Sequence, residues 1–131
     1  MNKLQLLLRP YVLLVTRLLI SFVFLWHGLP KAINIDMAMD KFAGFGLPGL
    51  LGPITGWIEV IAAVLVVLGV KHLWANIALS FVIVGAIVTV QIPGGFTAGL
   101  ERDLLILTAT LVLSVFGPGM LALDKSTKAA H

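Results

Sequence analysis

Residues 51–70, LGPITGWIEVIAAVLVVLGV, form the stretch that decides the fold class of this chain. Glu59 is the only charged residue in the stretch, and nearly all the others are apolar or glycine. A helix needs about 20 predominantly apolar residues to cross the hydrocarbon core of a bilayer. This stretch therefore predicts a transmembrane helix that carries one ionisable side chain.

Three similar apolar runs flank this stretch, at residues 11–29, 73–92 and 104–123. Of the 131 residues, 60% are hydrophobic and 11% are charged, and the mean hydropathy is +1.08. A soluble domain is nearer about half apolar and about a quarter charged. The composition also excludes a collagen-like, disordered or disulfide-stapled chain. We therefore predict an all-α membrane protein, a four-transmembrane-helix bundle that forms a single domain over residues 1–131.

The connection at residues 30–50 has a pattern of its own. Asp36, Asp40 and Lys41 are interspersed with apolar residues, which indicates a short interfacial helix in this first outer loop. The sequence GFGLPG at residues 44–49 then predicts a turn that returns the chain to the membrane.

The charge and the absence of cysteine exclude several kinds of chemistry and of partner. There is no cysteine, so the chain cannot perform thiol–disulfide chemistry or build a cysteine zinc site. The net charge is +3, but the basic residues are spread over the ends of the apolar runs, so the expected partner is the lipid bilayer and not nucleic acid. The side of the membrane with the two termini and the loop near residue 71 has five Lys and Arg residues, and the opposite side has three. Since cytoplasmic loops carry the excess of Lys and Arg, both termini are predicted to lie in the cytoplasm, with the chain in the cell (inner) membrane. The five are Lys3, Arg9, Lys71, Lys125 and Lys128, and the three are Lys31, Lys41 and Arg102.

Polar side chains inside the predicted spans are candidates for a functional site. An ionisable group in a bilayer is costly and by default faces the interior of the bundle. Arg17 and Glu59 come within reach of each other, either as a buried bridge that fixes packing or as the floor of a pocket open toward the outer half. The candidates for lining this pocket are Arg17, His27, Lys31, Glu59, Gln91 and Glu101.

Small residues at helical spacing indicate close helix packing. Gly52 and Gly56 form a small-xxx-small pair on the side of the second span that carries Glu59. Gly85 belongs to a similar small stripe in the third span, between Ala78 and Thr89. We therefore predict structural packing roles for Gly52, Gly56 and Gly85.

A metal site is the weaker alternative for the polar groups. His27, Glu59 and Glu101 are acceptable ligand types for a divalent ion. No H-x-x-x-H or E-x-x-H spacing supports such a site, however. We therefore predict no metal.

A set of short motifs runs through the chain in a fixed order. They are Arg17, HGLPK at 27–31, FGLP at 45–48, Glu59 with Gly69, GF at 95–96, Glu101, and FGPG at 116–119 before Asp124. In this order the chain resembles the DoxX family of small four-helix membrane proteins over nearly its whole length. Gln91 stands where many relatives carry His, and Ala122 where they carry Ser. Because Gln does not titrate, a proton-relay role is not expected at position 91.

The resemblance implies a link to membrane redox chemistry, since the chain is similar to the membrane subunit of a thiosulfate:quinone oxidoreductase. It implies a quinone as ligand and a soluble oxidoreductase or redox-complex subunits as partners. The sequence contains no complete catalytic or electron-carrier constellation, so the electrons would come from a partner. Two other functions stay open. One is a non-catalytic membrane scaffold or assembly factor, and the other is a small transporter that would need a homo-oligomer.

Overall fold

The computed structural model describes residues 1–124 of the chain, and these residues contain helices and connections but no strand. The elements are α1 (Lys3–Ile33), α2 (Ile35–Gly44), α3 (Leu51–Leu68), α4 (His72–Ala86), the π-helix η1 (Ile87–Gln91) and α5 (Ala98–Phe116). The predicted all-α class is confirmed, and residues 35–44 of the first long connection are helical as predicted.

Three helical segments are long and apolar enough to cross a membrane: Lys3–Ile33, Leu51–Leu68 and His72–Gln91. The fourth predicted span corresponds to α5, which has 19 residues but carries Glu101, Arg102 and Asp103 near its start. The described residues therefore contain three candidate spans by length and composition, against the four that the apolar runs predict.

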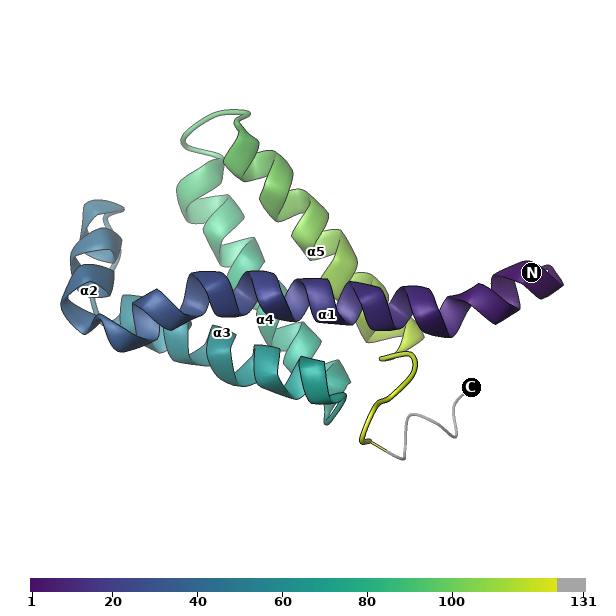
Figure 1. The fold of residues 1–131 in the computed structure, drawn as a ribbon. Coiled ribbons are helices and arrows are strands. Elements are labelled where there is room, and N and C mark those ends of the chain that lie inside the picture. Colours follow the sequence, from purple (N-terminus) through teal and green to yellow (C-terminus); the bar gives the residue numbers. More distant parts are fainter. Residues whose placement is uncertain (125–131) are drawn as a thin grey trace.

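The helices are arranged as two pairs. α1 packs along α3, and α4 packs along α5, while the α3–α4 connection joins the pairs. Figure 1 shows that α4 and α5 diverge from α1 and α3 toward the loop that joins α4 to α5. The short α2 lies at the same end of α3 as the C-terminal end of α1.

Glycines allow α1 and α3 to approach closely. A Cβ atom on Gly56 would lie 2.7 Å from the backbone nitrogen of Ala32 and 2.7 Å from Cβ of Lys31. A Cβ on Gly28 would lie 2.8 Å from Cβ of Glu59, and one on Gly52 would overlap the carbonyl oxygen of Ala38 in α2. Gly52 and Gly56 therefore lie at tight helix contacts, as the small-xxx-small pair predicts.

Gly85 was also predicted to pack against a neighbouring helix, but the structure shows no such contact. A Cβ atom built on Gly85 meets nothing within 4 Å outside its own helix. The residue is also exposed. The small stripe of the third span therefore does not place Gly85 at a helix–helix contact.

The difference between these glycines gives a stability prediction. Gly56→Leu is expected to lower the free energy of unfolding by about 3 kcal/mol or more, because the new side chain would clash with the backbone of α1 and not with a flexible side chain. Gly85→Leu, the same change at an open position, is the matched control and is expected to change it by less than about 1 kcal/mol. Thermal unfolding and folded yield in detergent measure both. Equal losses in the two variants would contradict this account of the α1–α3 contact.

Two helices, α1 and α5, have bounds that differ from the predicted ones at both ends. α1 spans Lys3–Ile33 and not residues 11–29: the Asn2 side chain caps its start by accepting from the backbone nitrogen of Gln5, and the helix continues through Pro30. α5 spans Ala98–Phe116 and not residues 104–123, because Gly117 leaves the helical conformation with φ of 90° and Pro118 follows it.

The surface of the described helices is strongly apolar. Large apolar side chains are exposed along every long helix, among them Phe22, Trp26, Trp74, Phe81, Leu105 and Val115. A soluble monomer rarely exposes so extensive an apolar surface, whereas lipid covers it without cost. The fold is therefore that of a membrane protein.

Candidate functional site

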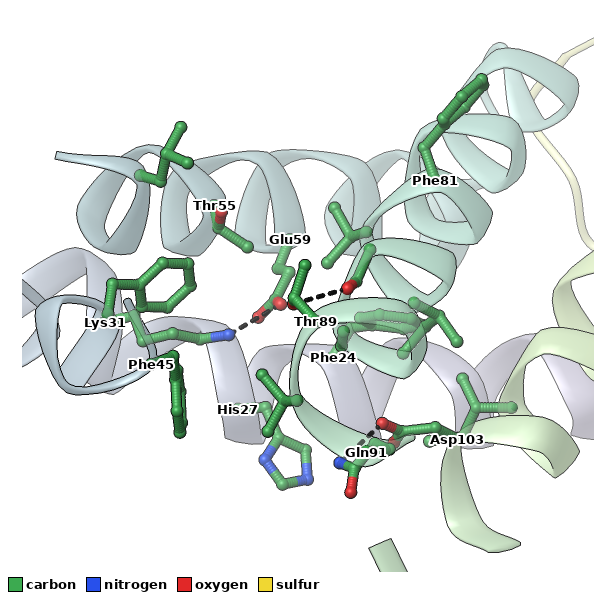
Figure 2. Close-up of a pocket in the computed structure, with 18 of the residues that line it drawn as sticks. Phe24, His27, Lys31, Phe45, Thr55, Glu59, Phe81, Thr89, Gln91 and Asp103 are labelled. Carbon is green, nitrogen blue, oxygen red and sulfur yellow. Dashed lines mark hydrogen bonds and ion pairs between the residues drawn. The ribbon is translucent and has the colours of Figure 1, made fainter. Parts of the chain in front are cut away.

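A cavity of about 440 Å³ lies between the two helix pairs. Its walls come from α1, α2 and α3 on one side and from α4, η1 and α5 on the other. Apolar side chains form most of the lining, and Figure 2 shows the polar ones converging among them. The ionisable and amide groups that line it are His27, Lys31, Lys41, Glu59, Gln91, Arg102 and Asp103.

An ion pair joins α1 to α3 in the cavity wall. Lys31 Nζ lies 2.7 Å from Oε1 of Glu59, and the two side chains are 16% and 5% exposed. Glu59 stands midway along α3, and the absence of a side chain on Gly28 lets its carboxylate lie against α1. The other oxygen, Oε2, is buried and has no hydrogen-bond partner among the described residues. Glu59 therefore retains an acceptor within the cavity wall.

A second polar group joins η1 to α5. Gln91 Nε2 donates to Oδ2 of Asp103 at 3.0 Å, and Arg102 Nε lies 3.1 Å from Oδ1 of the same carboxylate. Asp103 is only 3% exposed. The π-helical turn at residues 87–91, marked by the bond from Ile92 N to Ile87 O, precedes this contact. Such turns occur frequently at functional sites.

Asp103, and not the predicted Glu101, is the carboxylate that α5 contributes to the cavity. The structure buries Asp103, Ile106, Thr110 and Leu113 along one face of α5, whereas Glu101 is exposed and does not line the cavity. The helical spacing in the sequence could have identified Asp103, because it places Asp103 on the same face as these apolar and hydroxyl residues.

His27 lies between the two polar groups. Figure 2 shows its ring in the region between Lys31 and Gln91. Lys31, Lys41 and Arg102 line the same cavity as His27, together with the Asp103 carboxylate. This part of the cavity is therefore rich in hydrogen-bond donors.

Arg17 lies outside the cavity, although it was a candidate for the cavity floor. Its Nη2 donates to the carbonyl oxygens of Met120 at 3.0 Å and Leu121 at 3.4 Å. The predicted bridge between Arg17 and Glu59 is therefore not formed. Glu59 pairs with Lys31, and the chain after α5 supplies Arg17 with backbone acceptors that a side-chain pattern cannot reveal.

Among residues 1–124, no three His, Asp or Glu side chains lie close enough together to hold a metal ion. The alternative site from His27, Glu59 and Glu101 is thus not assembled. Lys125, Lys128 and His131 lie outside the described residues.

Comparisons with known proteins agree with a membrane protein. The chain is 31% identical over 111 residues to the Bacillus subtilis (strain 168) protein named "Putative oxidoreductase CatD", which covers 85% of this chain and 83% of that protein. It is 29% identical over 127 residues to "Inner membrane protein YphA" of Escherichia coli (strain K12), covering 89% and 91% of the two chains. No solved structure matches it. The model of the DoxX family matches residues 12–92, and the chain belongs to the DoxX family.

Proposed function

We propose that this DoxX protein is a redox-linked membrane subunit whose cavity holds the head group of a quinone. The observation that carries the proposal is the combination of apolar walls with two convergent polar groups, Lys31–Glu59 and Gln91–Asp103, in one cavity of about 440 Å³. Small-ligand sites have this composition and volumes of about 300–1,000 Å³.

The donors and acceptors suit the two redox states of such a head group. A quinone presents two carbonyl acceptors, which the Lys31 ammonium and the His27 and Arg102 side chains can meet with donors. A quinol presents hydroxyl donors, for which the Glu59 and Asp103 carboxylates in the cavity lining are acceptors. Phe24, Phe42 and Phe45 supply flat apolar surface in the same cavity.

The electrons come from a protein partner in this proposal. Reduction of a quinone takes up two electrons and two protons, and the chain's contribution is to bind and orient the head group. The partner is a soluble oxidoreductase or a subunit of a membrane redox complex. The name of the Bacillus subtilis relative, an oxidoreductase, supports this role.

Retention of quinone by the purified protein tests the proposal. Wild type in mild detergent is expected to retain quinone in about stoichiometric amount, and Glu59→Gln to lose it, because Lys31 loses the carboxylate that positions its ammonium. Mass spectrometry of a solvent extract and the ultraviolet spectrum measure the quinone. Glu101→Gln is the matched control, since this carboxylate is exposed and outside the cavity.

A membrane scaffold is the second candidate, and the tight contacts at Gly28, Gly52 and Gly56 favour it. If the protein is a scaffold, Glu59→Gln mainly lowers the folded yield, and extracts of wild type and of the variant both contain no quinone. If the cavity is a ligand site, the variant stays folded and only the ligand is lost. A homo-oligomer is compatible with both functions.

We also propose that α5 is a fourth crossing and that both termini lie in the cytoplasm of the cell inner membrane. The 19 residues of α5 give a length of about 28 Å, close to the hydrocarbon thickness of about 30 Å. The name of the Escherichia coli relative supports the inner membrane.

Single introduced cysteines test this topology, because the chain has none of its own. A membrane-impermeant maleimide is expected to label Ala43→Cys and Phe96→Cys in intact spheroplasts, and Lys71→Cys only after permeabilisation. All three positions are exposed. Labelling of Lys71→Cys in intact spheroplasts would reverse the orientation, and labelling of Phe96→Cys only after permeabilisation would contradict the proposed arrangement of α4 and α5.

A further inference from the structure

The cavity reaches the side of the bundle along one face of α4 and η1. Phe81, Gly85 and Thr89 are spaced four residues apart, so they share a helical face, and all three both line the cavity and are exposed. Phe81 is 75% exposed. A Cβ atom on Gly85 would meet nothing within 4 Å. The wall is therefore open at Gly85.

The opening lies on a candidate membrane span, so it is expected to face hydrocarbon and not water. The candidate span His72–Gln91 has Phe81 near its middle, about 15 Å along the helix from Gln91. The charged lining residues come from the other elements of the cavity wall, and Figure 2 shows Phe81 apart from the groups around His27 and Gln91. The part of α4 that lines the opening carries only apolar or small side chains: Phe81, Val82, Gly85 and Ala86.

We infer that the gap at Gly85, on the exposed face of α4, is a lateral portal through which the hydrocarbon tail of a bilayer-resident quinone passes from the cavity into the membrane. This inference rests on the proposed function, and it specifies the ligand as one with a long apolar chain. Glycine at position 85 is then a determinant of specificity, because any larger side chain would occupy the portal.

The form of the cavity favours a tail over a second copy of this chain. Gly85 lines the same cavity as Lys31 and Glu59. One molecule can therefore occupy both the opening and the polar part of the cavity. A stable protein interface needs a surface of about 800 Å² on each partner. A cavity of about 440 Å³ matches a small molecule instead.

Two ligands and two tryptophan variants test the portal. The ligands are 2,3-dimethoxy-5-methyl-1,4-benzoquinone without a chain and the same head group with a saturated ten-carbon chain, titrated against the purified protein in nanodiscs. Gly85→Trp is expected to weaken binding of the tailed ligand by about tenfold or more and of the tailless ligand by less than about twofold. Comparing variants for each ligand separately removes the effect of partitioning into lipid.

Val84→Trp is the matched control, because Val84 is exposed on the same helix but does not line the cavity. It is expected to leave both affinities unchanged. Gly85→Leu repeats the test with a smaller side chain, should the tryptophan variant fold poorly. An equal loss of both ligands in these variants, or no loss of either, would overturn the portal while leaving the quinone site in place. No binding of either ligand by wild type would overturn both.

Two further readouts exclude other occupants. Solvent extracts of wild type and Gly85→Trp, purified in parallel, are expected to differ in quinone and not in phospholipid. Loss of phospholipid alone would assign the opening to a lipid chain and overturn the inference. Size-exclusion chromatography with light scattering is expected to give the same oligomeric state for both proteins. A change from dimer to monomer would identify the opening as an interface between copies, and would also overturn it.

Discussion

Replacing Lys31 with methionine is expected to lower the free energy of unfolding by about 3 kcal/mol, since breaking a buried ion pair by removing one partner leaves an uncompensated charge. Glu59 is 4% exposed, and its Oε2 already lacks a hydrogen-bond partner among the described residues. Without Lys31, its Oε1 loses its donor as well. Denaturant titration in detergent micelles measures the effect.

The reverse substitution is expected to cost less. Glu59→Gln leaves the Lys31 ammonium without its carboxylate, but the Lys31 side chain is 16% exposed and lines the cavity, so water reaches it. The double variant Lys31→Met/Glu59→Gln is expected to recover most of the loss, to within about 1 kcal/mol of wild type, because no unpaired charge remains. This asymmetry is also why Glu59→Gln is the suitable variant for ligand retention.

The pair formed by Arg102 and Asp103 supplies a matched control. Arg102→Met removes the same kind of partner, but the Arg102 side chain is 50% exposed and Asp103 keeps its bond from Gln91. Its expected cost is below about 1 kcal/mol. If Lys31→Met proved as mild as Arg102→Met, the ion pair between α1 and α3 would not be what holds Glu59 in place.

The sequence predicted the helices well because the apolar runs are long. Residues 51–70 were predicted as a span, and α3 covers Leu51–Leu68, ending where Gly69 adopts φ of 69°. The end of α5 was missed because residues 117–119, Gly-Pro-Gly, interrupt an apolar run whose composition continues beyond them. The π-helical turn at residues 87–91 could not be predicted, since one wider turn leaves the composition unchanged.

The contacts that each side chain makes were harder to predict than the helix on which it lies. The side-chain pattern placed Lys31, Glu59 and Gln91 at one end of the bundle, and the structure brings all three to one cavity. It paired Glu59 with Arg17, which was wrong: Lys31 is the partner, and Arg17 donates to backbone carbonyls after α5. Gly56 and Gly85 gave the same signal, yet one packs against a backbone and the other faces open space. The difference lies in how the helix pairs diverge, which no local pattern encodes.

The segment after α5 lies against α1 and the end of α3, and Arg17 donates hydrogen bonds to its backbone. Leu123 N donates to Leu68 O at 3.0 Å, and Asp124 N donates to Gly69 O at 3.1 Å. Gly69 makes room for this contact, since a Cβ on it would lie 2.5 Å from Cβ of Ala122. Arg17 is 2% exposed and supplies the donor for Met120 and Leu121.

Arg17→Leu is therefore expected to release this segment and to reduce the exchange protection of the Leu123 and Asp124 amides by about tenfold or more. Each carbonyl that loses a buried donor costs about 1–3 kcal/mol, and 1.4 kcal/mol corresponds to about a factor of ten. Hydrogen–deuterium exchange of the C-terminal peptide measures this loss, and the protection of α3 is expected to persist.

Arg9→Leu is the control for the release of the segment. Arg9 lies on the same helix and donates to Phe116 O at 3.3 Å, but it does so at an exposed position, and its removal is expected to change protection by less than about threefold. Equal loss in both variants would mean that any cation on this part of α1 holds the segment. Unchanged protection in Arg17→Leu would mean that the backbone bonds to Leu68 and Gly69 suffice. The two contacts between the Arg17 guanidinium and the carbonyl oxygens would then not be what keeps the segment in place.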